Sequence, residues 1–209
     1  MMNKLKFILG LAAMFTIAIA SAQVKTADGE VIAGSPYTDD KYKDGVIYYG
    51  TDKNQPAPIR YNAYQDLIEY QQNGKALVLD ANPGIKKVIV GSEVFVPLSP
   101  KANSKKLGYF AVLDSGKVTL YSKKQIVFQP FKRGGKLDGS DQPAEFQKKP
   151  DIYYYQLGDG ELVEIDNIKS LIAGLPDKQD ELSQYAKKEK ISAKKEKDLV
   201  QFVKYYNSL

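Results

Sequence analysis

The sequence predicts an α+β fold, with an antiparallel β-sheet of about 8 to 11 strands, sandwich- or barrel-like, followed by two or three C-terminal helices. Between residues 46 and 165, short runs rich in Val, Ile, Tyr and Phe are separated by turn residues, which is typical of strands. After residue 166 the apolar residues recur at intervals of three and four, as on one face of a helix. Strand and helix patterns do not alternate, so a doubly wound parallel sheet is excluded.

The strand predictions rest on runs of high β-propensity that are bounded by turn residues. The expected strands are 46–49, 58–63, 64–71, 75–79, 87–90, 93–98, 108–113, 117–121, 125–128, 152–157 and 162–165. Short segments that tolerate positive φ join three pairs of these runs and predict antiparallel hairpins. They are Asn73-Gly74, Asp114-Ser115-Gly116 and Gly158-Asp159-Gly160.

The C-terminal helices are predicted from apolar periodicity and from residues that begin or end helices. The first helix carries apolar residues at the spacing of one helical face: Ile168, Leu171, Ile172 and Leu175. Asp166 is its expected N-cap, and Pro176 ends it. Asp177 and Ser192 are the expected N-caps of a second and a third helix.

The pattern divides the chain into four segments. These are a signal peptide at 1–22, a flexible N-terminal arm at 23–45, a β-rich domain at 46–165, and a helical segment at 166–209 packed on the sheet. Within the β-rich domain, residues 132–150 are rich in Gly, Asp, Lys and Pro and nearly devoid of apolar residues, so we expect a mobile loop there.

The N-terminal 22 residues have the three parts of a secretory signal peptide. Lys4 and Lys6 precede an apolar run from residue 7 to 20, and the small-residue sequence Ala20-Ser21-Ala22 follows it. The apolar run is shorter than the roughly 20 residues of a membrane-spanning helix, and no later segment is long enough to span a bilayer. We therefore expect cleavage between Ala22 and Gln23 and a periplasmic or extracellular protein with no transmembrane segment in its mature form.

The chain contains no histidine and no cysteine, which excludes several kinds of chemistry. Serine and cysteine nucleophiles that depend on histidine have no base, and zinc, copper and haem sites of the usual kind have lost their preferred protein ligands. Disulfides are impossible. We therefore predict no metal site, no cofactor and no catalytic residues, and the sequence favours binding over catalysis.

The charge of the chain is only moderately positive. The formal net charge of +5 includes the two lysines of the expected signal peptide, which leaves +3 on the mature chain. A charge this small does not by itself indicate nucleic-acid binding, so no nucleic-acid partner is expected.

Tyrosine is abundant, and two tyrosines form a candidate ligand or partner face. Tyr153 and Tyr155 alternate with Tyr154 in a predicted strand, so they lie on the same face of the sheet. An exposed pair of rings forms a platform for sugars or for an apolar patch of a protein. Packing within the sheet is the alternative interpretation of the same pattern.

A lysine-rich stretch near the C-terminus supplies the remaining candidate binding residues. Residues 187–197 contain six lysines and two glutamates. A solvated helix face explains such a stretch, and attraction to anionic lipid headgroups or polyanionic envelope glycans is the functional alternative. The lysines that we assign to a partner face are Lys187, Lys188, Lys190, Lys194 and Lys195.

Two other functions remain open. A carboxylate-based hydrolase acting on envelope polysaccharide needs two suitably spaced acids. The acids on or beside predicted strands are Asp66, Glu69, Asp80, Glu93, Asp114 and Glu164. A carrier of lipids or small ligands needs a sheet that encloses a hollow apolar interior.

The order of several short motifs resembles that of a group of small exported bacterial proteins with no assigned function. The motifs are GVIYY at 45–49, IRYNAY at 59–64, DLIEY at 66–70, GYFAVLDSGK at 108–117, YYY at 153–155 and YYN at 205–207. The resemblance covers most of the mature chain and implies no catalytic residues. We expect an exported, non-enzymatic protein that binds an envelope component, either a protein or a glycan.

Overall fold

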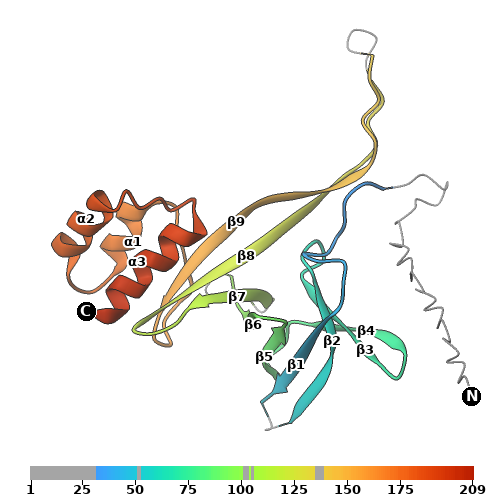
Figure 1. Cartoon of the computed structure of the whole chain (residues 1–209), viewed down its shortest axis with the longest axis horizontal. Helices are drawn as coiled ribbons and strands as arrows, with labels where there is room; N and C mark the ends of the chain where they lie inside the picture. Colours follow the sequence, from blue (N-terminus) through green and yellow to red (C-terminus); the bar gives the residue numbers. More distant parts are fainter. Residues whose placement is uncertain (1–31, 51–52, 101–103, 105, 135–138) are drawn as a thin grey trace, which may run out of the picture.

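The computed structural model describes residues 32–50, 53–100, 104, 106–134 and 139–209, and these contain a ten-stranded antiparallel sheet followed by three helices (Figure 1). The order of the strands is β10-β9-β8-β7-β6-β5-β1-β2-β3-β4, so β10 and β4 are the two edges of an open sheet. The predicted α+β class is confirmed, including the antiparallel sheet and the C-terminal helices. The expected signal peptide and its cleavage site lie outside the described residues.

Most predicted strands are present, with shifted ends. The strands are β1 Lys43–Tyr49, β2 Asn54–Asn62, β3 Leu67–Gln72, β4 Lys75–Asp80, β5 Ile85–Val90, β6 Glu93–Leu98, β7 Gly108–Asp114, β8 Val118–Gln129, β9 Glu145–Leu157 and β10 Val163–Glu164. The runs predicted at 117–121 and 125–128 form one strand, because β8 continues through a register shift between Lys123 and Gln125. All three predicted hairpins are present. Asn73 and Gly74 both have positive φ, as a two-residue turn of this kind requires.

The predicted loop at 132–150 is wrong in its second part, because β9 begins at Glu145. Residues 145–149 pair with 125–129 of β8, and the ladder ends in a bridge between Lys132 and Gln142. In Figure 1 this ribbon projects away from the rest of the molecule. Much of it lies outside the core, so it lacks the apolar alternation by which a strand is recognised in sequence.

The described part of the predicted flexible arm is held against the sheet. Ala33 pairs in parallel with Glu145, and Tyr37 forms a bridge with Asn62. The backbone N–H of Thr38 donates a hydrogen bond to the carbonyl of Tyr61 over 3.1 Å. Contacts between a polar segment and a distant strand produce no periodic pattern in the sequence of the segment, so the sequence predicted a flexible arm.

Three helices follow the sheet and cover one face of its β7–β9 end (Figure 1). They are α1 Ile168–Gly174, α2 Gln179–Lys188 and α3 Glu196–Ser208. The expected N-caps are each displaced. Asn167 caps α1 in a reciprocal pair of hydrogen bonds with Ser170, while α2 and α3 follow Lys178 and Lys195, whose side chains make no capping bond. None of the described helices has the length and apolar character needed to cross a bilayer.

The buried apolar residues form three clusters. The first joins the helices to β8 and β9 and includes Leu120, Leu171 and Phe202. The second lies under β1–β3 and β5–β7, where the rings of Tyr61 and Phe95 have centroids 4.8 Å apart. The third contains Phe110, Tyr121 and Tyr154. The alternation along β9 assigns Tyr154 to this third cluster and Tyr155 to the first.

Candidate functional site

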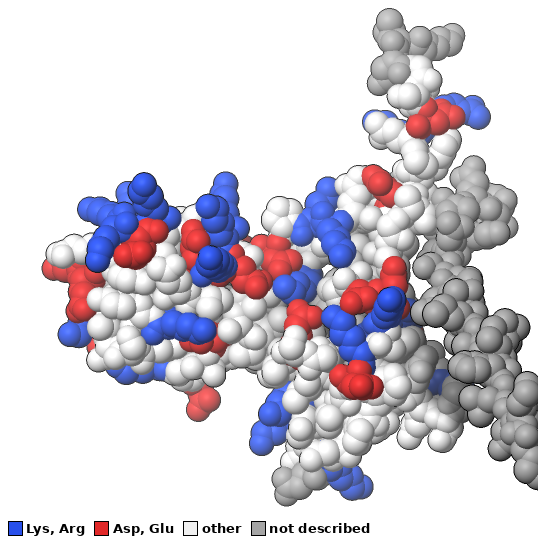
Figure 2. Space-filling view, viewed as in Figure 1, with Lys and Arg blue, Asp and Glu red and all other residues white. Residues whose placement is uncertain are grey.

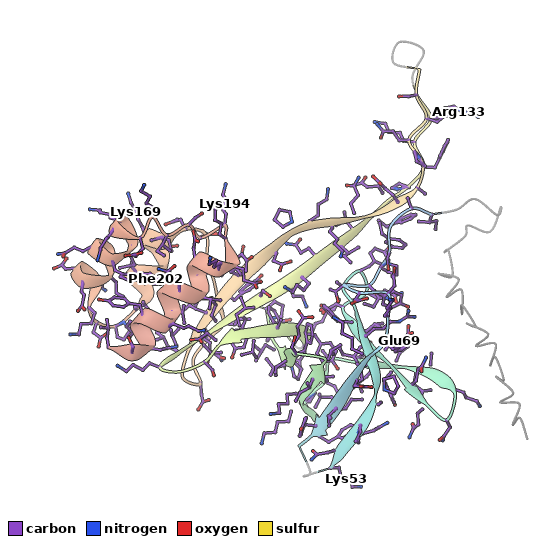
Figure 3. The ribbon with its side chains drawn as sticks, viewed as in Figure 1. Lys53, Glu69, Arg133, Lys169, Lys194 and Phe202 are labelled. Atoms are coloured by element: carbon purple, nitrogen blue, oxygen red, sulfur yellow. The ribbon has the colours of Figure 1, made fainter. Side chains whose placement is uncertain are left out.

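The five predicted lysines are all exposed at the helical end of the molecule. We call them the lysine surface: Lys187, Lys188, Lys190, Lys194 and Lys195. They lie at the end of α2 and in the connection to α3. Figure 2 shows lysine and arginine side chains gathered over the helices, and Figure 3 places Lys194 on the same side of the helices as Lys169. Within the described structure only Lys188 of the five has an ion pair, 4.0 Å from the neighbouring Glu189. The other four make no ion pair with the described residues.

The two predicted tyrosines lie beneath the helices. Tyr155 is only 6% exposed and belongs to the core cluster of the helical end. Gly174 of α1 leaves room for its hydroxyl, since a Cβ at that position would overlap it. Tyr153 is half-buried and packs against the same cluster. A partner on the lysine surface would therefore not contact the buried ring of Tyr155, whereas Tyr153 lies beside the backbone of Glu196, next to Lys195.

A different pair of tyrosines is stacked at the surface between α2 and α3. The rings of Tyr185 and Tyr205 are parallel within 10°, with centroids 3.8 Å apart. Tyr205 donates a hydrogen bond to Glu181 over 2.8 Å, and the hydroxyl of Tyr185 accepts one from Gln201 over 3.1 Å. Both tyrosines are half-buried and border an open hollow of about 560 Å³, together with Lys197 and Lys204.

This hollow was missed from the sequence, although a signal for it was present. Lys197, Gln201, Lys204 and Ser208 follow one another at helical spacing, on the opposite side of α3 from its buried apolar residues. Only the contribution of Tyr185 from α2 depends on the tertiary fold. Because the ring positions are fixed by hydrogen bonds, the stacked pair is a rigid surface beside the two lysines.

Of the acids considered for hydrolysis, four accept hydrogen bonds from protein side chains: Asp66, Glu69, Asp114 and Glu164. Glu93 instead borders a surface hollow of about 300 Å³ that also contains Lys124 and Asp151. Asp151 forms an ion pair with Lys124 over 2.9 Å, so of the two acids beside this hollow one already has a counter-charge. The chain's own donors thus bind the carboxylates of four of the six acids, while no hydrogen bond is described for the carboxylates of Asp80 and Glu93.

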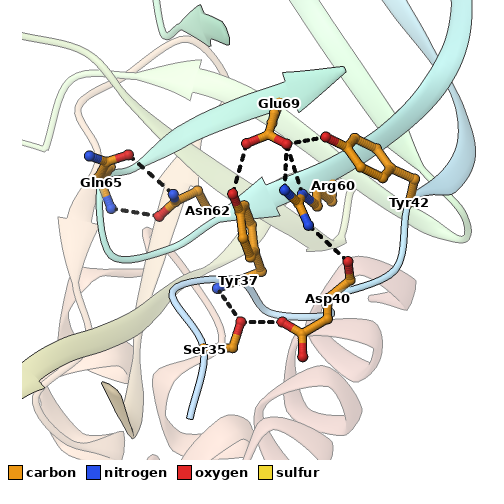
Figure 4. A network of polar contacts seen from close by, with 8 residues as sticks. All are labelled: Ser35, Tyr37, Asp40, Tyr42, Arg60, Asn62, Gln65 and Glu69. Atoms are coloured by element: carbon orange, nitrogen blue, oxygen red, sulfur yellow. Dashed lines mark hydrogen bonds and ion pairs between the residues drawn. The ribbon is translucent and has the colours of Figure 1, made fainter. Parts of the chain in front are cut away.

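Glu69 is the centre of a polar network that binds the arm to β2 and β3 (Figure 4). Arg60 forms an ion pair with it over 2.5 Å, while Tyr37 and Tyr42 both donate hydrogen bonds to it. The guanidinium carbon of Arg60 lies 3.6 Å from the centroid of Tyr37 and 4.4 Å from that of Tyr42. The arginine is therefore held between two rings and a carboxylate, and little of its charge is left for a ligand.

The surroundings of Glu69 keep it ionised. Burial alone would raise its pKa, but the hydrogen bonds from Tyr42, Tyr37 and Arg60 outweigh burial and hold the pKa below its ordinary value of 4.5. The same burial and the bond to Glu69 raise the pKa of Tyr37 to about 12. Neither group is suited to transfer a proton near neutral pH, so the network fastens the arm and is not an acid–base site.

A second ion pair connects the β2–β3 corner to β8. Lys123 lies 2.5 Å from Asp66, which also accepts hydrogen bonds from the hydroxyl of Tyr61 and the backbone N–H of Tyr109. The ammonium of Lys123 donates to the carbonyl of Tyr109 over 2.8 Å. Burial lowers the pKa of Lys123, against the opposing effect of Asp66. All the strong partners of this pair are within the chain, as expected of a structural contact.

A carrier of lipids or small ligands needs a hollow apolar interior, but the cluster beneath β1–β3 and β5–β7 is filled by side chains. Tyr61, Phe95 and Tyr109 are each no more than 1% exposed, and the Tyr61 and Tyr109 rings meet edge to face. Among the described residues, no cluster of three or more acidic side chains could hold a metal ion.

Comparisons of the chain with protein-family models, with curated proteins and with solved structures find no match.

Proposed function

We propose that the mature chain is an exported, non-enzymatic binding protein of the cell envelope, and that its lysine surface binds an anionic polysaccharide. The observation that carries the proposal is a set of five exposed lysines, four of which have no ion pair within the described structure. A group of like charges that the chain does not neutralise favours a polyanionic partner. The hollow beside Tyr185 and Tyr205 adds flat rings, against which sugar rings pack.

A polysaccharide fits this surface better than a lipid bilayer does. Helices that bind a membrane surface combine a basic face with large apolar side chains that enter the acyl region. The exposed large apolar residues of the described chain are Tyr64, Leu77, Val78, Phe131, Val163 and Leu209. None of these lies among residues 187–195, so the lysine surface has no apolar anchor within it.

We do not propose catalysis, because four of the six acids considered for hydrolysis are bound by the chain's own donors. Glu69 fastens the arm and Asp66 is paired with Lys123. The lowered pKa of Glu69 also makes it a poor proton donor.

The proposal is tested by measuring binding of residues 23–209 to polygalacturonate, a polyanionic polysaccharide, and to neutral dextran. Replacing the five lysines of the lysine surface by glutamine should weaken binding to polygalacturonate about tenfold or more, and binding should weaken as salt is raised. Dextran should not bind measurably.

The matched control replaces five exposed lysines away from the helices: Lys41, Lys53, Lys86, Lys106 and Lys132. It removes the same charge and should retain most of the affinity. Equal losses in the two variants would show that net charge alone is responsible, and would contradict a specific surface. Binding to phosphatidylglycerol vesicles but not to polygalacturonate would also contradict the proposal.

A further inference from the structure

Strand β4 is an uncovered edge of the sheet. It pairs with β3 over its whole length, from Lys75 opposite Gln72 to Asp80 opposite Leu67, and no strand of the described structure lies on its other side. The two-residue turn at Asn73-Gly74 makes Gln72 and Lys75 a hydrogen-bonded pair. Successive residues alternate, so the backbone groups of Ala76 and Val78 point away from the sheet. Among the described residues, no additional hydrogen bond reaches the backbone of Ala76 or Val78.

The side chains of this edge are apolar and exposed. Val78 is 59% exposed and Leu77 is 36% exposed. The strand contains no proline and no bulge, and Lys75 is its only basic residue. Natural proteins protect exposed edges with prolines, bulges or charged side chains, because an unprotected edge pairs with other strands. At the opposite edge β10 covers only Tyr154 and Tyr155 of β9, and the adjoining part of β9 carries two lysines and a proline at residues 148–150, which are features that discourage pairing.

Symmetry restricts how β4 pairs with a second copy of itself. A two-fold axis perpendicular to the sheet gives an antiparallel pair in which each face of the sheet continues across the junction. Opposed residues must then lie on the same face. With Leu77 on the axis, Leu77 faces Leu77 in a non-hydrogen-bonded pair, and each Ala76 faces Val78 in a hydrogen-bonded pair.

This register is complementary in three respects. The backbone groups that point outward from Ala76 and Val78 bond to each other. The small Ala76 lies beside the larger Val78, and the exposed leucines cover one another. The like charges of the two copies do not face each other, because Lys75 lies opposite Leu79.

We propose that β4 is a self-association surface, through which two copies of the chain join their sheets with Leu77 on the two-fold axis. The pair closes at a dimer, because the two-fold axis uses the β4 edge of each copy and leaves no second β4 edge to pair. A six-residue strand buries less than the roughly 1,200 Å² of a standard interface, so the dimer should be weak and should form at high concentration. The helices lie at the other end of the sheet, so the dimer carries its two lysine surfaces far from the junction.

The absence of cysteine from the chain allows a direct test of the register. Leu77→Cys introduces one thiol that meets its copy across the axis, at about 4.5 Å between Cα atoms, within the range for a disulfide. Val78→Cys is the matched control. It lies one residue away and is more exposed, but its copy is diagonal and about 7–8 Å distant, too far for an unstrained bridge.

Under mild oxidation of the mature chain at high concentration, Leu77→Cys should form a covalent dimer several times faster than Val78→Cys. Faster crosslinking of Val78→Cys would place Val78 on the axis or indicate random collision, and either result would overturn the proposed register. Val163→Cys on β10 gives the rate for an exposed position at the other edge.

Sedimentation velocity of the unmodified mature chain gives the second readout. The mass should double as the protein concentration is raised, and Val78→Lys should shift this transition to at least tenfold higher concentration because it places a charge at the junction. A monomer at every concentration would overturn the proposal, as would a dimer that Val78→Lys leaves unchanged.

Discussion

The two ends of the sheet are completed in different ways. At the β8–β10 end, three helices cover the apolar face, and Val118, Leu120 and Phe202 are completely buried. At the other end, β4 has no helix over it and exposes Leu77 and Val78. The helical end thus satisfies its apolar surface within the chain and presents lysines to solvent. The β4 end leaves apolar surface and backbone groups for another polypeptide. Both halves have a buried core, since Ile59 and Ile68 near β4 are also completely buried, so the two ends differ in whether the outermost strand is covered.

The largest effect should come from removing a core side chain at the helical end. Phe202, labelled in Figure 3, lies on α3 and packs against the sheet. Phe202→Ala should lower the free energy of unfolding by about 3–5 kcal/mol, because it leaves a cavity among side chains that cannot collapse into it. Val78→Ala at the other end should change it by no more than about 0.5 kcal/mol. Urea unfolding followed by circular dichroism measures both. Similar values for the two variants would contradict the unequal roles of the two ends.

An intermediate effect is expected where the two halves of the sheet are joined. Lys123→Met removes the cation beside Asp66, whose carboxylate is 26% exposed. The unfolding free energy should fall by about 2–3 kcal/mol, because a half-buried carboxylate loses its counter-charge. The double variant Lys123→Met/Asp66→Asn should recover part of the loss. Additive losses in the two single variants would show that the pair is not coupled.

A smaller, pH-dependent effect should come from the arm network. The pKa of Glu69 is lower in the folded chain than its ordinary value of 4.5, so ionised Glu69 stabilises the fold at neutral pH. This contribution is complete above about pH 4.5 and is lost as pH falls through the lowered folded pKa. Glu69→Gln should cost about 1–2 kcal/mol at pH 7, and the difference from the natural chain should shrink below pH 4. Urea titrations at pH 7, 4 and 3 test this, and a difference that does not depend on pH would refute it.

Local chemistry determined how much of the fold could be predicted. Glu93–Leu98 was predicted with its observed bounds, because its β-branched and aromatic residues lie between clear turns. Glu145–Leu157 was only half predicted, because its first residues pair with β8 outside the core and need no apolar face. The cap of α1 was predicted one residue early. Asp166 and Asn167 are both good capping residues. Asn167 is the cap because its side chain and that of Ser170 form reciprocal hydrogen bonds with each other's backbone N–H.

The candidate site shows the same division between local and tertiary information. Exposure of the lysine surface follows from composition, because lysines are rarely buried without a partner. The alternation that placed Tyr153 and Tyr155 on one face is correct, but it does not say whether that face is covered, and α1 covers it. The stacking of Tyr185 on Tyr205 depends on how α2 and α3 cross, which the spacing within either helix does not determine.

The most direct test of the lysine surface is a footprint of lysine reactivity. Residues 23–209 are methylated reductively with and without polygalacturonate, and the rate at each lysine is read by mass spectrometry. We expect the polymer to protect Lys187, Lys188, Lys190, Lys194 and Lys195 and to leave Lys41, Lys53, Lys86, Lys106 and Lys132 reactive. Equal protection of the two sets, or protection confined to the second set, would contradict the assignment of the helical end as the binding end.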